Sequence, residues 1–224
     1  MKKELFNYDN GKTKMNYAVY TPENYKDLPL VIYLHGAGER GTDITHLDRH
    51  GVSKLLSDGK EYPAVILTPQ CPADRVWDNV VSELKEIIDK VALQYEIKAD
   101  RIALTGSSMG GFGTWMMGMT YPNFFSVIVP VAGGGMSWRT TNLKTTPVIA
   151  YHGGSDSVVP PVYSQLCVDG VNRNGGTAEL IILDGMEHND GINYAYRETN
   201  LMERIVKYRR TDFDAVPEFC SQLF

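Results

Sequence analysis

Short, continuous apolar runs recur along the chain and alternate with longer amphipathic stretches. Runs of this kind are typical of strands that are buried on both faces of a parallel sheet. The stretches between them are long enough for the crossover helices that parallel strands require. The strands predicted in this way lie at residues 30–34, 64–68, 102–105, 127–131, 148–151 and 178–183, after an earlier, candidate antiparallel strand at 15–20. The alternation predicts an α/β fold, with a doubly wound, mostly parallel sheet and helices on both faces.

Helical periodicity fills several of the intervening segments. The predicted helices span residues 81–95, 110–119, 160–176 and 199–210. Asp78 is the expected N-cap of the first helix, and Pro160 and Pro161 are expected to open the third. The polar stretch 39–62 is only weakly periodic, and we interpret it as a long excursion of the kind that often carries function.

The chain length favours a single domain over residues 1–224. Hydrophobic residues make up 43% of the chain and charged residues 22%, an ordinary composition for a soluble globular domain. The formal net charge is −5 and no basic cluster occurs, so we expect neither nucleic acid nor a membrane surface as a partner. The polar N-terminus lacks the apolar core of a signal peptide, and no run is long enough to span a bilayer, so we expect a cytoplasmic protein.

The three cysteines, Cys71, Cys167 and Cys220, are scattered along the chain. Their odd number and irregular spacing do not fit a disulfide framework. None belongs to a Cys-x-x-Cys pair, so a zinc ribbon is not indicated. We therefore interpret the thiols as structural and expect neither a metal nor a cofactor.

A Gly-x-Ser-x-Gly pattern, Gly106-Ser107-Ser108-Met109-Gly110, lies between an apolar strand and a predicted helix. A serine on such a sharp strand-to-helix turn projects its hydroxyl above the sheet, and the flanking positions must be tiny because backbone approaches closely there. The strand–turn–helix context makes Ser108 the predicted nucleophile. Ser107 is the alternative, but its position in the pattern predicts a side chain that points away from the crevice.

The strand at 30–34 ends in His35-Gly36-Ala37-Gly38-Glu39-Arg40-Gly41, a run of small residues that lets backbone N–H groups face a reaction intermediate. We predict that the backbone N–H groups of Ala37 and Met109 form an oxyanion hole. His35 has two interpretations, and we favour a structural hydrogen-bonding residue over a catalytic base.

Two histidines, His152 and His188, follow Ser108 in the chain. Where a serine nucleophile lies on such a strand-to-helix turn, the acid, Asp or Glu, follows it in the chain, and the histidine base comes last. Asp156 lies in a glycine-rich turn after a strand, and His188 lies in a predicted loop after the last strand, so we predict Asp156 as the acid and His188 as the base. Asp184 also ends a strand and is the alternative acid, whereas His152 is interpreted as a residue that holds its turn.

Four side chains are candidate substrate contacts: Trp77, Trp138, Glu39 and Arg40. Both tryptophans lie in loops after predicted strands, and binding pockets are commonly lined by aromatic residues. Packing beneath a loop is the alternative interpretation for each of them. For Glu39 and Arg40 we favour a surface ion pair over contact with substrate.

These motifs together resemble the α/β-hydrolase superfamily. The resemblance spans roughly residues 30–189 and rests on the segments 35–41, 106–111, 152–156 and 187–188. It is strongest to the esterase branch that includes phospholipase/carboxylesterases, feruloyl esterases, dienelactone hydrolases and prolyl-oligopeptidase-like peptidases. The resemblance implies a Ser108–His188–Asp156 triad, with Ala37 and Met109 as oxyanion donors.

Three departures narrow the expected reaction. Dienelactone hydrolases use a cysteine where this chain has Ser108, prolyl oligopeptidases carry a propeller domain that these residues do not provide, and no insertion is apolar enough for a large lid. We therefore expect a minimal lid or none, and a serine hydrolase that cleaves small-molecule esters of short or aromatic acyl groups, including esters of carbohydrates. A small peptidase or thioesterase is the alternative, followed by a non-catalytic binding module. The oligomeric state stays open.

Overall fold

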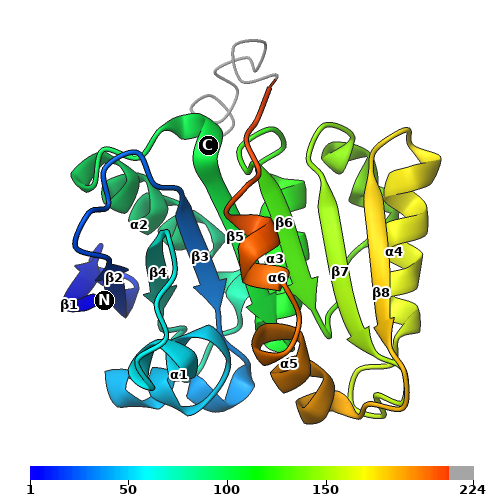
Figure 1. Cartoon of the computed structure of the whole chain (residues 1–224), viewed down its shortest axis with the longest axis horizontal. Coiled ribbons are helices and arrows are strands. Elements are labelled where there is room, and N and C mark those ends of the chain that lie inside the picture. Colours follow the sequence, from blue (N-terminus) through cyan, green and yellow to red (C-terminus); the bar gives the residue numbers. More distant parts are fainter. Residues whose placement is uncertain (212–224) are drawn as a thin grey trace.

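The structure, a computed structural model, describes residues 1–211, and its centre is one eight-stranded sheet (Figure 1). The strands are β1 (Lys2–Asp9), β2 (Lys14–Thr21), β3 (Leu30–Leu34), β4 (Val65–Pro69), β5 (Ile102–Ser107), β6 (Val127–Val131), β7 (Val148–Gly153) and β8 (Ala178–Leu183). Their order across the sheet is β1-β2-β4-β3-β5-β6-β7-β8. β3 to β8 run parallel, whereas β2 pairs antiparallel with both β1 and β4.

The predicted apolar runs all form strands, because the inner strands are covered on both faces. Every residue of β3, β4, β5, β6 and β7 is buried. β1 was not predicted. It is an edge strand that pairs with β2 alone and carries exposed side chains such as Leu5, so its sequence lacks a continuous apolar signal.

Helices cover both faces of the sheet, as the predicted fold requires (Figure 1). They are α1 (Gly51–Ser57), α2 (Val81–Gln94), α3 (Met109–Thr120), α4 (Val162–Arg173), α5 (His188–Arg197) and α6 (Leu201–Ile205). α2, α3 and α4 pack into one hydrophobic cluster, and α1, α5 and α6 pack into the other. No helix within residues 1–211 has the length and apolar character needed to cross a membrane.

Two expectations differ from the structure in detail. Asp78 does not cap α2, because it lies in the 3₁₀ turn Trp77–Asn79 and α2 begins at Val81. The expected excursion at 39–62 contains α1 and a 3₁₀ turn whose N-cap is Asp43. These elements are too short to show a helical period in the sequence.

The largest difference lies after β8. The sequence predicts a loop around His188 and a helix over 199–210, but α5 begins at His188 and α6 is only a short helix. α5 contains asparagine, aspartate and Gly191, which are weak helix formers, so its signal is poor. Tertiary packing decides its position, since a Cβ at Gly191 would lie 3.1 Å from the Gly153 Cα of β7.

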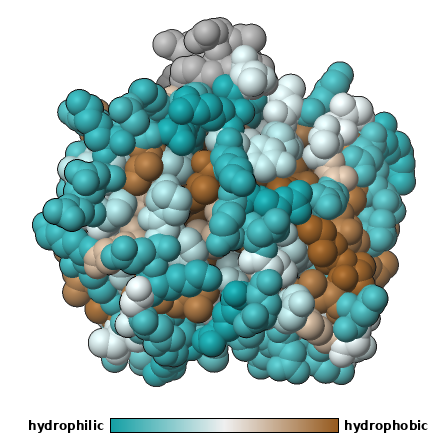
Figure 2. Space-filling model, viewed as in Figure 1, coloured by the Kyte–Doolittle hydropathy of each residue, from teal (hydrophilic) through white to brown (hydrophobic). Residues whose placement is uncertain are grey.

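The carboxyl ends of the parallel strands converge at the lower edge in Figure 1, beside α1 and α5. Loops that leave this edge come from strands far apart in the sequence, and such an edge is where α/β sheets build their sites. On the same view, Figure 2 shows apolar surface over β7 and β8, where α5 and α6 do not extend. The edge lined by α1 and α5 is the place where the predicted functional residues meet.

Candidate active site

Ser108 occupies the sharp turn between β5 and α3. Its backbone has φ 55° and ψ −118°, a conformation that is strained for any residue with a side chain. The backbone N–H of Ser108 donates a hydrogen bond of 3.0 Å to the carbonyl oxygen of Val131, which holds the turn against β6. α3 begins at the next residue, Met109, so the Ser108 side chain stands at the N-terminus of a helix.

The two glycines of the motif are required by close backbone contacts. A Cβ at Gly106 would overlap the carbonyl groups of Gly110 and Leu34. A Cβ at Gly110 would overlap the carbonyl groups of Leu34 and His35. The expectation of tiny flanking residues therefore has its cause in the packing of β5 and α3 against the end of β3.

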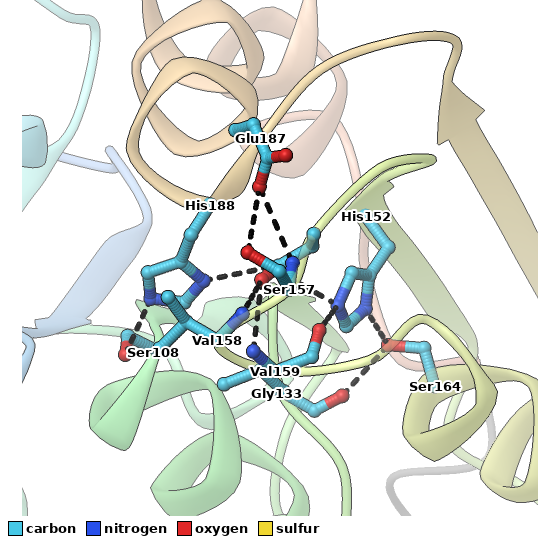
Figure 3. A network of polar contacts seen from close by, with 10 residues as sticks. Ser108, Gly133, His152, Ser157, Val158, Val159, Ser164, Glu187 and His188 are labelled. Atoms are coloured by element: carbon cyan, nitrogen blue, oxygen red, sulfur yellow. Dashed lines mark hydrogen bonds and ion pairs between the residues drawn. The ribbon is translucent and has the colours of Figure 1, made fainter.

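Ser108, His188 and Asp156 form a continuous hydrogen-bonded chain (Figure 3). His188 Nε2 lies 2.9 Å from Ser108 Oγ, and His188 Nδ1 lies 2.7 Å from Asp156 Oδ2. An ionised carboxylate only accepts, so Nδ1 carries the proton and donates to Asp156. Nε2 is then free to accept the proton of the Ser108 hydroxyl.

The Asp156 carboxylate is buried and held by backbone groups of its own turn. Its Oδ1 accepts hydrogen bonds from the N–H groups of Val158, at 3.0 Å, and Val159, at 2.8 Å. These bonds fix the orientation of the Asp156 carboxylate. The alternative acid, Asp184, is exposed at the end of β8, and His188 makes its hydrogen bond to Asp156.

A second histidine, His152, contacts the same turn on the side away from His188 (Figure 3). His152 is fully buried, and its Nε2 donates to the carbonyl oxygen of Val159 at 2.7 Å while lying 3.4 Å from Asp156 Oδ2. His152 Nδ1 lies 2.7 Å from Ser164 Oγ, which itself lies 2.7 Å from the carbonyl oxygen of Gly133. Burial lowers the pKa of His152. His152 therefore holds the turn, as the sequence interpretation proposed.

Glu187 links the acid turn to the start of α5. Its Oε2 accepts hydrogen bonds from the backbone N–H of Ser157, at 3.3 Å, and from the Ser157 hydroxyl, at 3.0 Å. Glu187 immediately precedes His188 in the chain. These bonds fix the residue next to the histidine against the turn that carries Asp156, a contact that the sequence did not reveal.

The loop after β3 carries the predicted oxyanion donors. Ala37 is the first residue of the 3₁₀ turn Ala37–Glu39, and Met109 is the first residue of α3. The N–H groups in the first turn of a helix have no intrahelical acceptor. Both amides are therefore available to a ligand, and their role as oxyanion donors stays a prediction.

His35 is a structural residue of the same loop. Its Nε2 accepts a 2.9 Å hydrogen bond from the backbone N–H of Cys71, and its Nδ1 donates to the carbonyl oxygen of Gly36. Burial lowers the pKa of His35 to about 4, so the ring is neutral near pH 7. The favoured structural interpretation of His35 therefore agrees with its contacts.

The two candidate tryptophans do not line the cavity at Ser108. Trp77 is 1% exposed, and its Nε1 donates a 3.0 Å hydrogen bond to the carbonyl oxygen of His35. A Cβ at Gly113 would lie 2.6 Å from the Trp77 Cβ, so α3 approaches this side chain directly. Trp77 is therefore a core residue, and its interpretation as a substrate contact is wrong. Trp138 is 76% exposed and lies outside the cavity lining.

Glu39 and Arg40 do not form the favoured surface ion pair. Arg40 Nε donates to the carbonyl oxygen of Ala37 at 3.0 Å, and its Nη1 donates to that of Arg75 at 3.3 Å. Glu39 is buried, with 3% of its surface exposed, and it lines the cavity beside Ser108. The less favoured alternative, contact with substrate, is thus the one that remains for Glu39.

The cavity at Ser108 has a volume of about 230 Å³. The loop 36–39 and the first turns of α5 line it, together with Ser107, Ser108 and His50. The sequence did not predict the lining residues Asn189, Ile192 and Asn193, because the helix that aligns them with His188 was not predicted. Ser107 also reaches the lining, but its hydroxyl pairs with that of Tyr33 at 3.0 Å and not with His188.

The described cysteines are buried and do not line the cavity at Ser108. Cys71 and Cys167 are free and buried, and burial raises their pKa to about 12 and about 11 respectively. Such thiols stay protonated and unreactive near pH 7. Cys220 lies outside the described residues. Among residues 1–211 no three histidine, cysteine or acidic side chains are grouped to hold a metal ion.

A serine on a strained strand-to-helix turn, hydrogen-bonded to a histidine that is itself hydrogen-bonded to an aspartate, with both partners later in the chain, defines the α/β-hydrolase class. The family comparison agrees with this class. Residues 62–193 match the phospholipase/carboxylesterase family, and the chain belongs to that family.

Several known proteins are similar to parts of the chain. An acetylxylan esterase of Coprinopsis cinerea is 26% identical over 64% of this chain and 41% of its own length. A bifunctional acetylxylan esterase/xylanase of Neocallimastix patriciarum is 25% identical over 63% of this chain and 21% of its own length. The chain thus spans less than half the length of these curated relatives.

Two solved structures share the fold. A thermostable esterase superimposes with a TM-score of 0.80 at 26% identity, covering 93% of this chain and 63% of that protein. The feruloyl esterase module from Clostridium thermocellum, solved with sinapinate, superimposes with a TM-score of 0.70 at 16% identity, covering 90% and 87%. At the lower identity the likeness concerns the fold alone.

Proposed function

We propose that this protein hydrolyses carboxylic esters through an acyl-enzyme formed on Ser108. The observation that carries the proposal is the unbroken chain from Ser108 Oγ through His188 to Asp156, with distances of 2.9 and 2.7 Å. Family membership and the similar esterases support the same reaction class. In this proposal Ser108 is the nucleophile, His188 the general base and Asp156 the residue that orients the base.

The proposed reaction begins when Ser108 Oγ attacks the ester carbonyl carbon and His188 Nε2 takes the hydroxyl proton. Asp156 stays ionised and stabilises the imidazolium that forms. The backbone N–H groups of Ala37 and Met109 donate to the oxyanion of the tetrahedral intermediate. The intermediate collapses when His188 returns the proton to the alcohol oxygen, which leaves.

The second half repeats these roles with water. His188 takes a proton from a water molecule, whose oxygen attacks the acyl carbon, and the resulting intermediate expels Ser108 Oγ as His188 returns the proton. The products are a carboxylic acid and the regenerated serine.

We further propose that the acyl group is short or aromatic and that the alcohol is a carbohydrate or similar small molecule. The cavity volume of about 230 Å³ is below the roughly 300–1,000 Å³ of pockets that enclose drug-sized ligands. The similar proteins named above include acetylxylan esterases and a feruloyl esterase module. The small volume of this cavity supports a compact acyl and alcohol group over a long lipid chain.

The experiment compares p-nitrophenyl acetate, a cinnamoyl ester and an aminoacyl amide as substrates. We expect both esters to be cleaved faster than the amide, and a fluorophosphonate probe to label Ser108. Ser108→Ala should lower kcat by about 10⁴–10⁶-fold. Ser82→Ala, an exposed serine on α2, is the matched control and should retain activity. Faster cleavage of the amide, or no labelling of Ser108, would contradict the proposal.

A further inference from the structure

The cavity at Ser108 contains a buried acidic side chain that the proposed mechanism does not use. Glu39 ends the 3₁₀ turn Ala37–Glu39, two residues after a predicted oxyanion donor. Only 3% of Glu39 is exposed, yet it lines the cavity together with Ser108 and His188. A carboxylate in this position faces whatever the cavity binds.

Among the described residues, no side chain donates a hydrogen bond to the Glu39 carboxylate; Gln70 Nε2 donates to the backbone carbonyl oxygen of Glu39, at 3.0 Å. His35 Nδ1 lies 3.9 Å from Glu39 Oε2, and its proton is directed to the carbonyl oxygen of Gly36. The backbone N–H of Glu39 itself is the donor that reaches the carboxyl group. A carboxylate has about four acceptor positions, and buried polar groups are normally paired. Glu39 therefore has unused acceptor capacity that points to a ligand.

The charges around Glu39 are mixed. Burial raises the pKa of the Glu39 carboxyl, while the side chains of His50 and Arg49 act in the opposite direction. An ionised Glu39 close to the oxyanion donors opposes the negative charge of the intermediate. A hydrogen-bond donor from the substrate would offset part of that repulsion.

The cavity walls indicate which half of the ester reaches Glu39. His188 must protonate the departing alcohol oxygen, so the alcohol lies beside His188 Nε2. His188 and Glu39 line the same small cavity, and the amide side chains of Asn189 and Asn193 line it as well. An alcohol group that receives the proton from His188 is thus within the space that Glu39 lines.

We infer that Glu39 is a specificity-determining residue that accepts a hydrogen bond from a free hydroxyl on the alcohol half of the ester. The preferred substrates are then esters of polyhydroxylated alcohols, such as sugars and glycerol. This inference rests on the proposed ester hydrolysis. A substrate that lacks the hydroxyl leaves the buried carboxylate unpaired, which is an effective way to reject it.

The test uses two substrates with the same acetyl group and the same three-carbon chain, 1-monoacetylglycerol and n-propyl acetate. The wild-type protein should show a higher kcat/KM for the glycerol ester. Because hydrogen bonds to charged groups are the stronger class, Glu39→Leu should lower kcat/KM for the glycerol ester by about 10–100-fold. n-Propyl acetate offers no hydroxyl to Glu39, so its kcat/KM should not show this loss, and the ratio of the two kcat/KM values should fall by about the same 10–100-fold. Glu39→Gln keeps a carbonyl acceptor and should lose less of the preference than Glu39→Leu.

The control variant is Asp184→Asn, which removes an exposed carboxylate outside the cavity and should leave the substrate ratio unchanged. Fluorophosphonate labelling and thermal unfolding show whether each variant is folded, and Glu39→Gln decides the test if Glu39→Leu does not fold. An unchanged ratio in the folded Glu39 variant, or equal losses on both esters, overturns the inference.

The wild-type protein separates the two proposals. If it is labelled at Ser108 and hydrolyses both esters equally well, the inference about Glu39 fails and the proposed ester hydrolysis stands. If the wild-type protein is neither labelled nor active on either ester, both proposals fail.

Discussion

The two sides of Ser108 differ in how their polar groups are satisfied. On the acid side, Asp156 is bonded to His188 and to backbone N–H groups, and His152 is bonded on both ring nitrogens. On the side of the β3 loop, the N–H groups of Ala37 and Met109 begin helical turns, and the Glu39 carboxylate receives no side-chain donor among the described residues.

This difference separates two tasks. Groups that must hold a proton relay in one geometry gain from partners inside the protein, because a preorganised site needs no rearrangement during reaction. Groups that recognise a substrate must keep hydrogen-bonding capacity for it. The polar groups of the acid side are therefore paired within the protein, whereas we propose that those of the β3 side pair with the substrate.

The largest effect is expected on the acid side, from a substitution of Asp156. Asp156→Asn replaces an acceptor by an amide that disturbs the His188 tautomer, so kcat for p-nitrophenyl acetate should fall by about 10⁴-fold. Steady-state kinetics measure this loss, and Asp184→Asn provides the comparison. Similar losses in both variants would restore Asp184 as the candidate acid.

The next effect concerns the stability of the β3 side in acid. Burial lowers the pKa of His35 to about 4, so between about pH 6.5 and pH 4 the unfolded chain binds a proton that the folded chain does not. The free energy of unfolding should therefore fall by about 3 kcal/mol as the pH drops through this window. Urea unfolding across the window should show a shallower decline for His35→Gln than for wild type. Parallel pH dependences would contradict the assignment.

A smaller effect is expected at Ser164, which is hydrogen-bonded to His152. Ser164→Ala removes the hydroxyl between His152 and Gly133 and leaves buried polar groups unpaired. The free energy of unfolding should fall by about 1–3 kcal/mol. Calorimetry should show a lower Tm, by about 2–4 °C for each kcal/mol, with Ser82→Ala unchanged. A Tm equal to that of wild type would show that the hydrogen bonds of Ser164 contribute little to the free energy of unfolding.

The smallest effect is expected at the link between Glu187 and Ser157. Both groups are exposed, so Glu187→Ala should lower kcat by less than about tenfold and leave KM nearly constant. Glu187→Gln retains a carbonyl acceptor and should restore most of the activity. An effect on KM instead of kcat would place Glu187 in substrate binding and not in the support of His188.

The strands and the turn at Ser108 were predictable because their signals are local. A buried parallel strand needs a continuous apolar run, and close backbone packing at Gly106 and Gly110 demands glycine. α5 was not predictable, because its residues are weak helix formers and the contact of Gly191 with β7 fixes it. The burial of Trp77 and Glu39 likewise depends on which segments fold over them. The sequence around Trp77 and Glu39 therefore does not predict their burial.

The contact between Gly110 and the end of β3 ties the serine turn to the loop that carries Ala37. Gly110 touches the carbonyl groups of Leu34 and His35, so any side chain at residue 110 would push the loop that begins there. Ser108 and the backbone N–H groups of Ala37 and Met109 are therefore held together by one packed contact. Substitutions at residue 39 or along α5 leave this contact intact. A substitution at Gly110 would change the distance between Ser108 and the loop that carries Ala37.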